Sequence, residues 1–98
     1  ISFRRKVIEN RLENLVFKTI PQRLSALFLE LAEEFGEKGP QGIRISVPLT
    51  HEDVASLVGA ARPTVSESLN EFRKQGSIAV EGKYFTILSP ETLRSLVS

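Results

Sequence analysis

The sequence predicts a mainly α-helical domain with a small antiparallel β wing, the fold class called a winged helix-turn-helix. A short capped helix is followed at once by a glycine and by a second helix that opens on a proline, within residues 50–76. A β-hairpin pattern follows in residues 78–88, and an amphipathic helix precedes the motif in residues 21–36. Helix-turn-helix and hairpin in this order favour the winged form.

Length and composition indicate a single globular domain. Ninety-eight residues with 41% hydrophobic and 26% charged content are typical of one globular domain. The absence of cysteine excludes disulfides, cysteine-ligated zinc and thiol catalysis in this segment. No apolar run approaches the roughly 18 residues that a membrane span needs. We therefore expect a soluble, cytoplasmic protein without a membrane partner.

The N-terminal segment carries a short heptad pattern. Ile1, Ile8 and Leu15 recur every seven residues with Leu12 between them, and Arg5 interrupts the seam. Two interpretations stay open, an amphipathic helix packed on its own domain and a dimerisation helix cut short. Because the chain begins without methionine in mid-pattern, we expect a preceding domain.

A core helix follows this segment. Pro21 suits its first turn, and Gly36 ends it. Its apolar stripe has i, i+3, i+4, i+7 spacing and consists of Leu24, Leu27, Phe28, Leu31 and Phe35. Residues 36–42 are predicted to be a loop, residues 43–47 alternate as a short strand, and Pro48 stops that strand.

The helix-turn-helix has clear start and stop signals. Thr50 is a candidate N-cap, with Asp53 as the acidic partner of a capping box, so a helix starts at His51. Gly59 ends it, and Pro63 opens the next helix. The second helix buries Val65, Leu69 and Phe72 and ends at Gly76, while its opposite face shows Arg62, Ser66, Glu67, Asn70 and Arg73.

The C-terminal part supplies the wing and a last helix. Two β-prone runs, 78–80 and 84–88, are joined through Glu81, Gly82 and Lys83, which predicts a hairpin with glycine in its turn. Ser89 then caps and Pro90 opens a short helix with Leu93, Leu96 and Val97 on its apolar face.

Charge does not by itself indicate a nucleic-acid binder. The net charge is only +1, with +3 in residues 1–18, −2 in residues 19–42 and zero in residues 43–98. The chemistry of the second helix is more informative, because a helix in the major groove reads base edges with short polar side chains near its N-terminus. Arg62, Thr64, Ser66 and Glu67 meet that need, although any exposed helix also carries such residues.

The stretch THEDVASLVGAARPTVSESLNEFRKQGSI, followed by EGKYFTI, resembles the C-terminal domain of the CRP/FNR (catabolite activator) regulators. The resemblance covers nearly the whole chain. It implies that residues 1–17 are the end of a dimerisation helix and its hinge, and that residues 18–98 are a winged helix-turn-helix DNA-binding domain. It also implies that an effector-binding domain precedes Ile1.

The resemblance implies two sets of DNA contacts. The base-reading positions are Arg62, which takes guanine O6 and N7, together with Pro63, Ser66 and Glu67; the phosphate-binding positions are Thr50, His51, Thr64 and Lys83. Structural alternatives stay open for the second set. Thr50 caps its helix with or without DNA, Thr64 favours its helix turn, and Lys83 is also explained as a solvated turn residue. His51 is a phosphate contact or a surface residue rather than a metal ligand, because no second ligand is near it in the sequence.

Two positions depart from the best-known members of the family. Pro63 stands where they have a glutamate that reads cytosine, and Glu67 stands where they have an arginine. Glu67 can accept a hydrogen bond from cytosine N4, or it lies at the groove edge and is repelled by phosphate. The operator preference of the family's namesake therefore does not carry over.

The function that these patterns favour is sequence-specific binding of double-stranded DNA by one arm of a dimeric transcription regulator. The homodimer would form through the N-terminal helix and the preceding domain, and RNA polymerase is left open as a further partner. No cofactor is expected in this segment, and the effector is unknown. The alternative is a winged-helix module that binds protein without DNA. We expect no enzyme, because titratable residues are not grouped; Glu33 and Glu34, for example, are adjacent and solvated.

Overall fold

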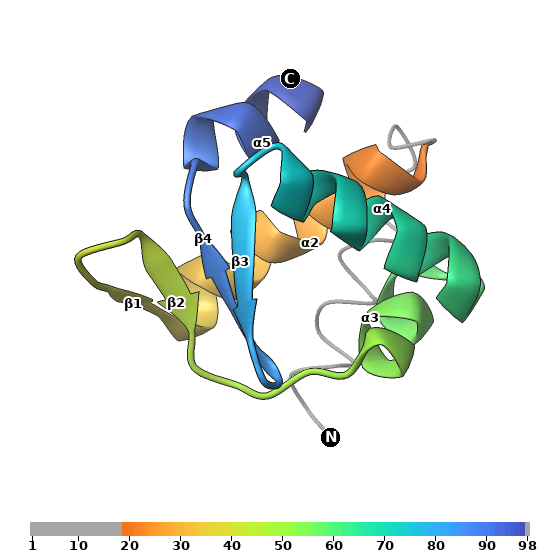
Figure 1. Ribbon diagram of the computed structural model, residues 1–98, viewed down its shortest axis with the longest axis horizontal. Helices are drawn as coiled ribbons and strands as arrows, with labels where there is room; N and C mark the ends of the chain where they lie inside the picture. Colours follow the sequence, from red (N-terminus) through yellow and green to blue (C-terminus); the bar gives the residue numbers. More distant parts are fainter. Residues whose placement is uncertain (1–18, 98) are drawn as a thin grey trace.

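A computed structural model describes residues 19–97 of the chain (Figure 1). The elements are α2 (Ile20–Phe35), β1 (Gly36–Lys38), β2 (Ile43–Ile45), α3 (His51–Val58), α4 (Arg62–Lys74), β3 (Ile78–Glu81), β4 (Tyr84–Ile87) and α5 (Pro90–Val97). Within residues 19–97, four helices and one small antiparallel sheet confirm the predicted winged helix-turn-helix. The predicted seam in residues 1–17 lies outside the described residues.

Helix α2 is the central element of the core. It packs against α5, α3, α4 and β2, with Leu24, Leu27, Phe28 and Leu31 fully buried as predicted and Phe35 half-buried. Its start is fixed by a capping box in which Thr19 Oγ1 accepts from the Gln22 N–H and Gln22 Oε1 accepts from the Thr19 N–H, each at 3.2 Å. Pro21 in the first turn was predicted from the sequence, whereas this capping box was not.

The sheet is larger than the predicted wing. Its strands run in the order β1-β2-β4-β3, all antiparallel, so the wing hairpin β3–β4 is joined to β2. Two predictions were wrong here. The expected loop 36–42 begins with strand β1, because residues 36–38 pair with residues 43–45. The expected strand 43–47 ends at Ile45. Its partner strand β1 begins at Gly36, directly after α2, so β2 has no further strand residues to pair with. The last bond runs from the Ser46 N–H to the Phe35 carbonyl at 2.9 Å.

Gly36 ends α2 as predicted, but not through a left-handed conformation. Its φ is −79°, which any residue adopts. A Cβ atom placed there would lie 2.2 Å from the Ala32 carbonyl oxygen and 2.6 Å from Ile43 Cγ2. Glycine is therefore required by the close approach of helix and strand.

The helix-turn-helix follows the predicted boundaries closely. Helix α3 has eight residues, and Gly59 after it has φ 71°, the left-handed region that glycine occupies without strain. The N–H groups of Gly59 and Ala60 both donate to the Ala55 carbonyl, so the turn is closed on α3. Helix α4 then begins at Arg62 with Pro63 in its first turn. In Figure 1 the two helices lie beside each other, on the side of the sheet away from β1.

Candidate nucleic-acid interface

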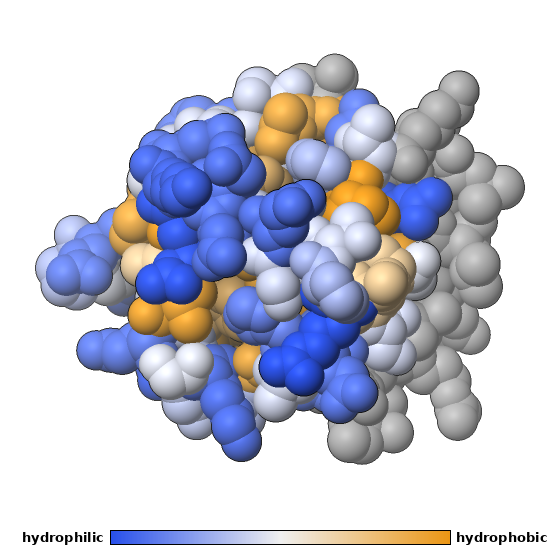
Figure 2. Space-filling model, turned by 45° about the vertical axis from the view of Figure 1, so that its right-hand side comes forward, coloured by the Kyte–Doolittle hydropathy of each residue, from blue (hydrophilic) through white to orange (hydrophobic). Residues whose placement is uncertain are grey.

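Helix α4 has one buried face and one exposed face. Val65, Leu69 and Phe72 are 0%, 0% and 4% exposed, so this stripe fixes the orientation of the helix on the core. The residues of its first two turns that the sequence predicts to meet DNA are on the other side: Arg62, Pro63, Thr64 and Glu67 are exposed and Ser66 is half-buried. The face on which α3 and α4 come forward is mostly hydrophilic (Figure 2). The anchored helix therefore presents polar side chains outward.

The start of α3 is held by a complete capping box. Thr50 Oγ1 accepts from the Asp53 N–H and Asp53 Oδ2 accepts from the Thr50 N–H, both at 3.0 Å. The Thr50 hydroxyl uses a lone pair in this contact and keeps its hydrogen. Thr50 can therefore cap the helix and donate to a phosphate oxygen at the same time, and the two interpretations are compatible.

The wing is tied to the segment just before α3. The Leu49 N–H donates to the Lys83 carbonyl at 2.8 Å, and Leu49 is 2% exposed. Lys83 stands in the two-residue turn between Glu81 and Tyr84, with its side chain exposed. Because Leu49 immediately precedes Thr50, the structure brings Lys83, Thr50 and His51 to one end of the domain. Among the described residues, no hydrogen bond joins Thr64, on α4, to this group.

A contact that the sequence did not predict joins α3 and α4. His51 Nδ1 lies 2.7 Å from Ser66 Oγ, and both side chains are partly buried. One of these residues is a predicted phosphate contact and the other a predicted base reader. The two sets of predicted DNA contacts are thus linked by a direct hydrogen bond.

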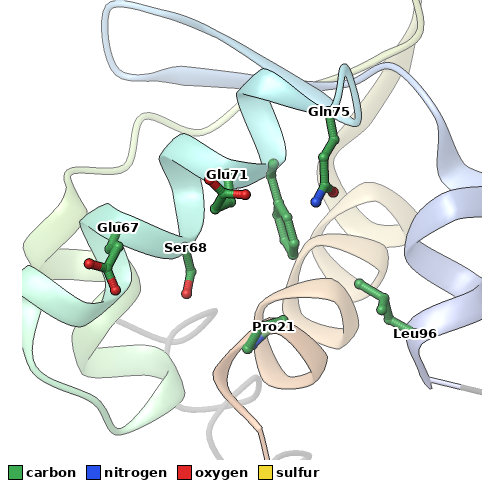
Figure 3. Close-up of a pocket in the computed structure, with 7 residues that line it drawn as sticks. Pro21, Glu67, Ser68, Glu71, Gln75 and Leu96 are labelled. Atoms are coloured by element: carbon green, nitrogen blue, oxygen red, sulfur yellow. The ribbon is translucent and has the colours of Figure 1, made fainter.

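Glu67 lies at the edge of a groove behind the exposed face of α4 (Figure 3). The groove, about 310 Å³, is lined by Pro21, Glu67, Ser68, Glu71, Phe72, Gln75 and Leu96 from α2, α4 and α5. Helical spacing places Arg62, Ser66 and Arg73 on the opposite flank of the helix. The exposed surface of α4 therefore has an acidic flank with Glu67 and Glu71 and a basic flank with Arg62 and Arg73.

Two other kinds of site receive no support from the described residues. In residues 19–97 no group of three or more histidine, cysteine, aspartate or glutamate side chains is placed to hold a metal ion. Within the same range no helix has the length and apolarity to cross a membrane.

Comparison with known proteins identifies the family. Residues 22–96 match the family model described as the Crp-like helix-turn-helix domain. The chain is 39% identical to the CRP-like cAMP-activated global transcriptional regulator of Mycobacterium tuberculosis, over 86% of this chain and 38% of that protein. It is 33% identical to the global nitrogen regulator of Synechocystis, over 87% and 38%.

Solved structures agree with this result. The imidazole-bound CO-dependent transcription factor CooA of Carboxydothermus hydrogenoformans is similar with a TM-score of 0.76 at 30% identity, over 98% of this chain and 44% of that chain. A CRP/FNR family regulator from Thermus thermophilus has the same TM-score at 26% identity, over 90% and 45%.

The chain spans less than half the length of these relatives. The relatives are transcription regulators, and the family model covers the core, the helix-turn-helix and the wing described above. The chain therefore belongs to the CRP/FNR family of DNA-binding transcription regulators, of which it carries the Crp-like helix-turn-helix domain.

Proposed function

We propose that this chain reads duplex DNA sequence-specifically, as one arm of a dimeric regulator whose α4 enters the major groove. The observation that carries the proposal is the orientation of α4. Its buried stripe anchors it to the core, while Arg62, Pro63, Thr64 and Glu67 stand exposed on its first two turns. Helix-turn-helix proteins contact base edges with this part of the second helix.

The base-reading roles follow from side-chain chemistry. Arg62 offers two parallel N–H donors that match guanine O6 and N7, the commonest specific contact in the major groove. Ser66 has a hydroxyl that donates or accepts, and Glu67 accepts from cytosine N4. Pro63 offers only apolar surface, which suits a thymine methyl group.

The phosphate-binding roles belong mainly to the end of the domain where the wing meets α3. Lys83, Thr50 and His51 would supply an ammonium, a hydroxyl hydrogen and an imidazole there, a proposal supported by the backbone bond from Leu49 to Lys83. Thr64 would hold a further phosphate beside the start of α4. Such contacts set the register of the protein on the duplex and carry no sequence information.

Electrostatics favours a modest general affinity for DNA. Residues 43–98 have no net charge, and Glu67 and Glu71 make one flank of the exposed surface of α4 acidic. Few phosphates would therefore be neutralised, and specific contacts would supply much of the discrimination between sequences.

A second candidate function is a protein-binding module. It is favoured by the groove behind α4, in which Pro21, Phe72 and Leu96 supply apolar surface and Glu67 and Glu71 supply charge. A partner protein would bind in this groove, whereas DNA would bind over the exposed face of α4 that carries Arg62 and Glu67.

The dimer, its location and its other partners are parts of the same proposal. Dimerisation through residues 1–17 and a preceding domain would place two copies of α4 about one helical turn of DNA apart, roughly 34 to 36 Å. The protein would act in the cytoplasm, with RNA polymerase as a further partner and an effector bound outside residues 18–98. That effector is left open.

Selection of bound sequences from a random duplex library tests the proposal. We expect enrichment of a two-fold symmetric site whose half-sites are one helical turn apart and contain a guanine. Enrichment of a single asymmetric half-site would contradict the dimer. No enrichment at all would contradict DNA reading and leave the protein-binding function in its place.

A further inference from the structure

The hydrogen bond between His51 and Ser66 joins the first residue of α3 to the second turn of α4. The Nδ1–Oγ distance is 2.7 Å, and neither side chain makes another hydrogen bond within residues 19–97. Imidazole Nε2 and the remaining hydrogen-bonding capacity of the Ser66 hydroxyl are therefore unused inside the described part of the domain. Both residues are partly exposed, so both have access to a ligand on this side of the domain.

The chemistry of the pair limits what Ser66 can do. A neutral imidazole has one nitrogen that donates and one that accepts, and the partner of one nitrogen determines the role of the other. A serine hydroxyl has a single hydrogen. If Ser66 gives that hydrogen to Nδ1, its oxygen can only accept from a base.

We propose, on the basis of the function proposed above, that His51 fixes the direction of the Ser66 hydroxyl and so selects the base that Ser66 reads. When Nε2–H donates to a DNA phosphate, Nδ1 is left as the acceptor and Ser66 donates to it. Ser66 Oγ then accepts only from a base with an amino group in the major groove, which is adenine through N6 or cytosine through N4. His51 is thus a positioning residue for base recognition as well as a phosphate contact.

Two substitutions of His51 separate these two roles. His51→Ala removes the phosphate contact and the acceptor for Ser66. His51→Asp places a carboxylate oxygen, bonded to Cγ as Nδ1 was, near the former position of Nδ1. Ser66 therefore still has an acceptor, while the negative charge repels phosphate. Ser66→Ala and the double variant His51→Ala/Ser66→Ala complete the set.

The position that Ser66 reads is identified as the one at which Ser66→Ala loses its base preference. Binding of each variant is then measured to four versions of the selected site, one with each base at that position. The buffer is held at about pH 8 for all variants. Wild type is expected to prefer adenine or cytosine over guanine and thymine by about 3- to 10-fold, the range for one neutral hydrogen bond. His51→Ala should reduce this ratio to less than about 2-fold, because the freed hydroxyl then donates or accepts. His51→Asp should weaken binding to all four sites and keep the ratio.

The double variant shows whether His51 acts through Ser66. In the Ser66→Ala background, His51→Ala should lower affinity for all four sites equally. The proposal is overturned if His51→Ala alone keeps the wild-type ratio, if wild type prefers guanine or thymine at this position, or if no position depends on Ser66. Thermal melts of all variants show whether each remains folded. Failure of wild type to select any sequence would instead overturn the proposed function, and this inference with it.

Discussion

Helices α3 and α4 begin in opposite ways. At the start of α3, Thr50 and Asp53 form a capping box with two 3.0 Å bonds, and Val54 and Ala55 are buried directly after it. At the start of α4, Ala61 makes no side-chain cap, and the next three residues are all exposed. The start of α3 is closed by its own side chains, whereas the start of α4 faces outward.

Within one helix-turn-helix, the start of α3 stabilises the fold and the start of α4 is available to bind DNA. A capped helix start contributes to folding whether or not a ligand is present. An uncapped, exposed start contributes less to stability and leaves its polar groups for a partner. Substitutions at α3 should therefore change stability first, and substitutions on the exposed face of α4 should change DNA binding first.

The largest expected effect is on the buried face of α4. Leu69→Ala removes a side chain that is 0% exposed and should lower the free energy of unfolding by about 2 to 5 kcal/mol. The neighbouring exposed variant Asn70→Ala should change it by less than about 0.5 kcal/mol. Chemical denaturation of both variants measures the difference. Equal stability would mean that α4 is not anchored by this stripe.

Loss of the α3 cap is expected to have the next effect. Thr50→Ala removes the acceptor for the Asp53 N–H and should cost about 1 kcal/mol of stability, a fall in Tm of about 4 to 8 °C for a domain of this size. Thr64→Ala is the matched control, since Thr64 is exposed on α4 and the cap of that helix is Ala61. If both variants had the same Tm, the Thr50 cap would not stabilise the domain more than the exposed residue Thr64.

Adding a cap to α4 is expected to stabilise the domain. Ala61 has φ −73° and ψ 145°, the extended conformation of an N-cap residue, so Ala61→Ser should raise stability by about 0.5 to 1 kcal/mol. Calorimetry of Ala61→Ser against wild type measures this gain. A variant no more stable than wild type would show that the open start of α4 has no cost in the free protein.

The smallest expected effect is at the wing. Lys83→Ala should weaken binding to all DNA sequences similarly and lower the salt slope by about one unit, because one phosphate contact is lost. Lys38→Ala is the control, since Lys38 is exposed on β1, at the edge of the sheet away from β3. Binding titrations at several salt concentrations separate the two. A changed base preference with an unchanged slope would contradict the role of Lys83.

The helix-turn-helix could be predicted from sequence because its signals are local. Thr50 with Asp53 marks the start of the first helix, Gly59 marks its end, and Pro63 marks the start of the second. The start of α2 had an equally local signal that was missed, Thr19 followed three residues later by Gln22. Strand β1 had none, because all of its residues are exposed and it forms only by pairing with β2.

The candidate site was predictable in its residues but not in its connections. Helical spacing gives the exposed face of α4, and the predicted positions Arg62, Pro63, Thr64 and Glu67 are on it. The bond between His51 and Ser66 spans 15 residues, and it depends on how α3 packs on α4, which no spacing along the chain determines. The bond from Leu49 to Lys83 depends in the same way on where the wing folds back.

The central claim is that the exposed start of α4 reads DNA, and binding of Arg62→Ala tests it most directly. Wild type, Arg62→Ala and the control Arg94→Ala, an exposed arginine on α5, are titrated with the selected site and its single-base variants. Arg62→Ala should lose about 1 to 3 kcal/mol on the preferred site and relax selection at one position of each half-site, which we expect to be a guanine. Arg94→Ala should bind like wild type. If Arg62→Ala bound every variant with the affinity and pattern of wild type, α4 would not be the recognition helix.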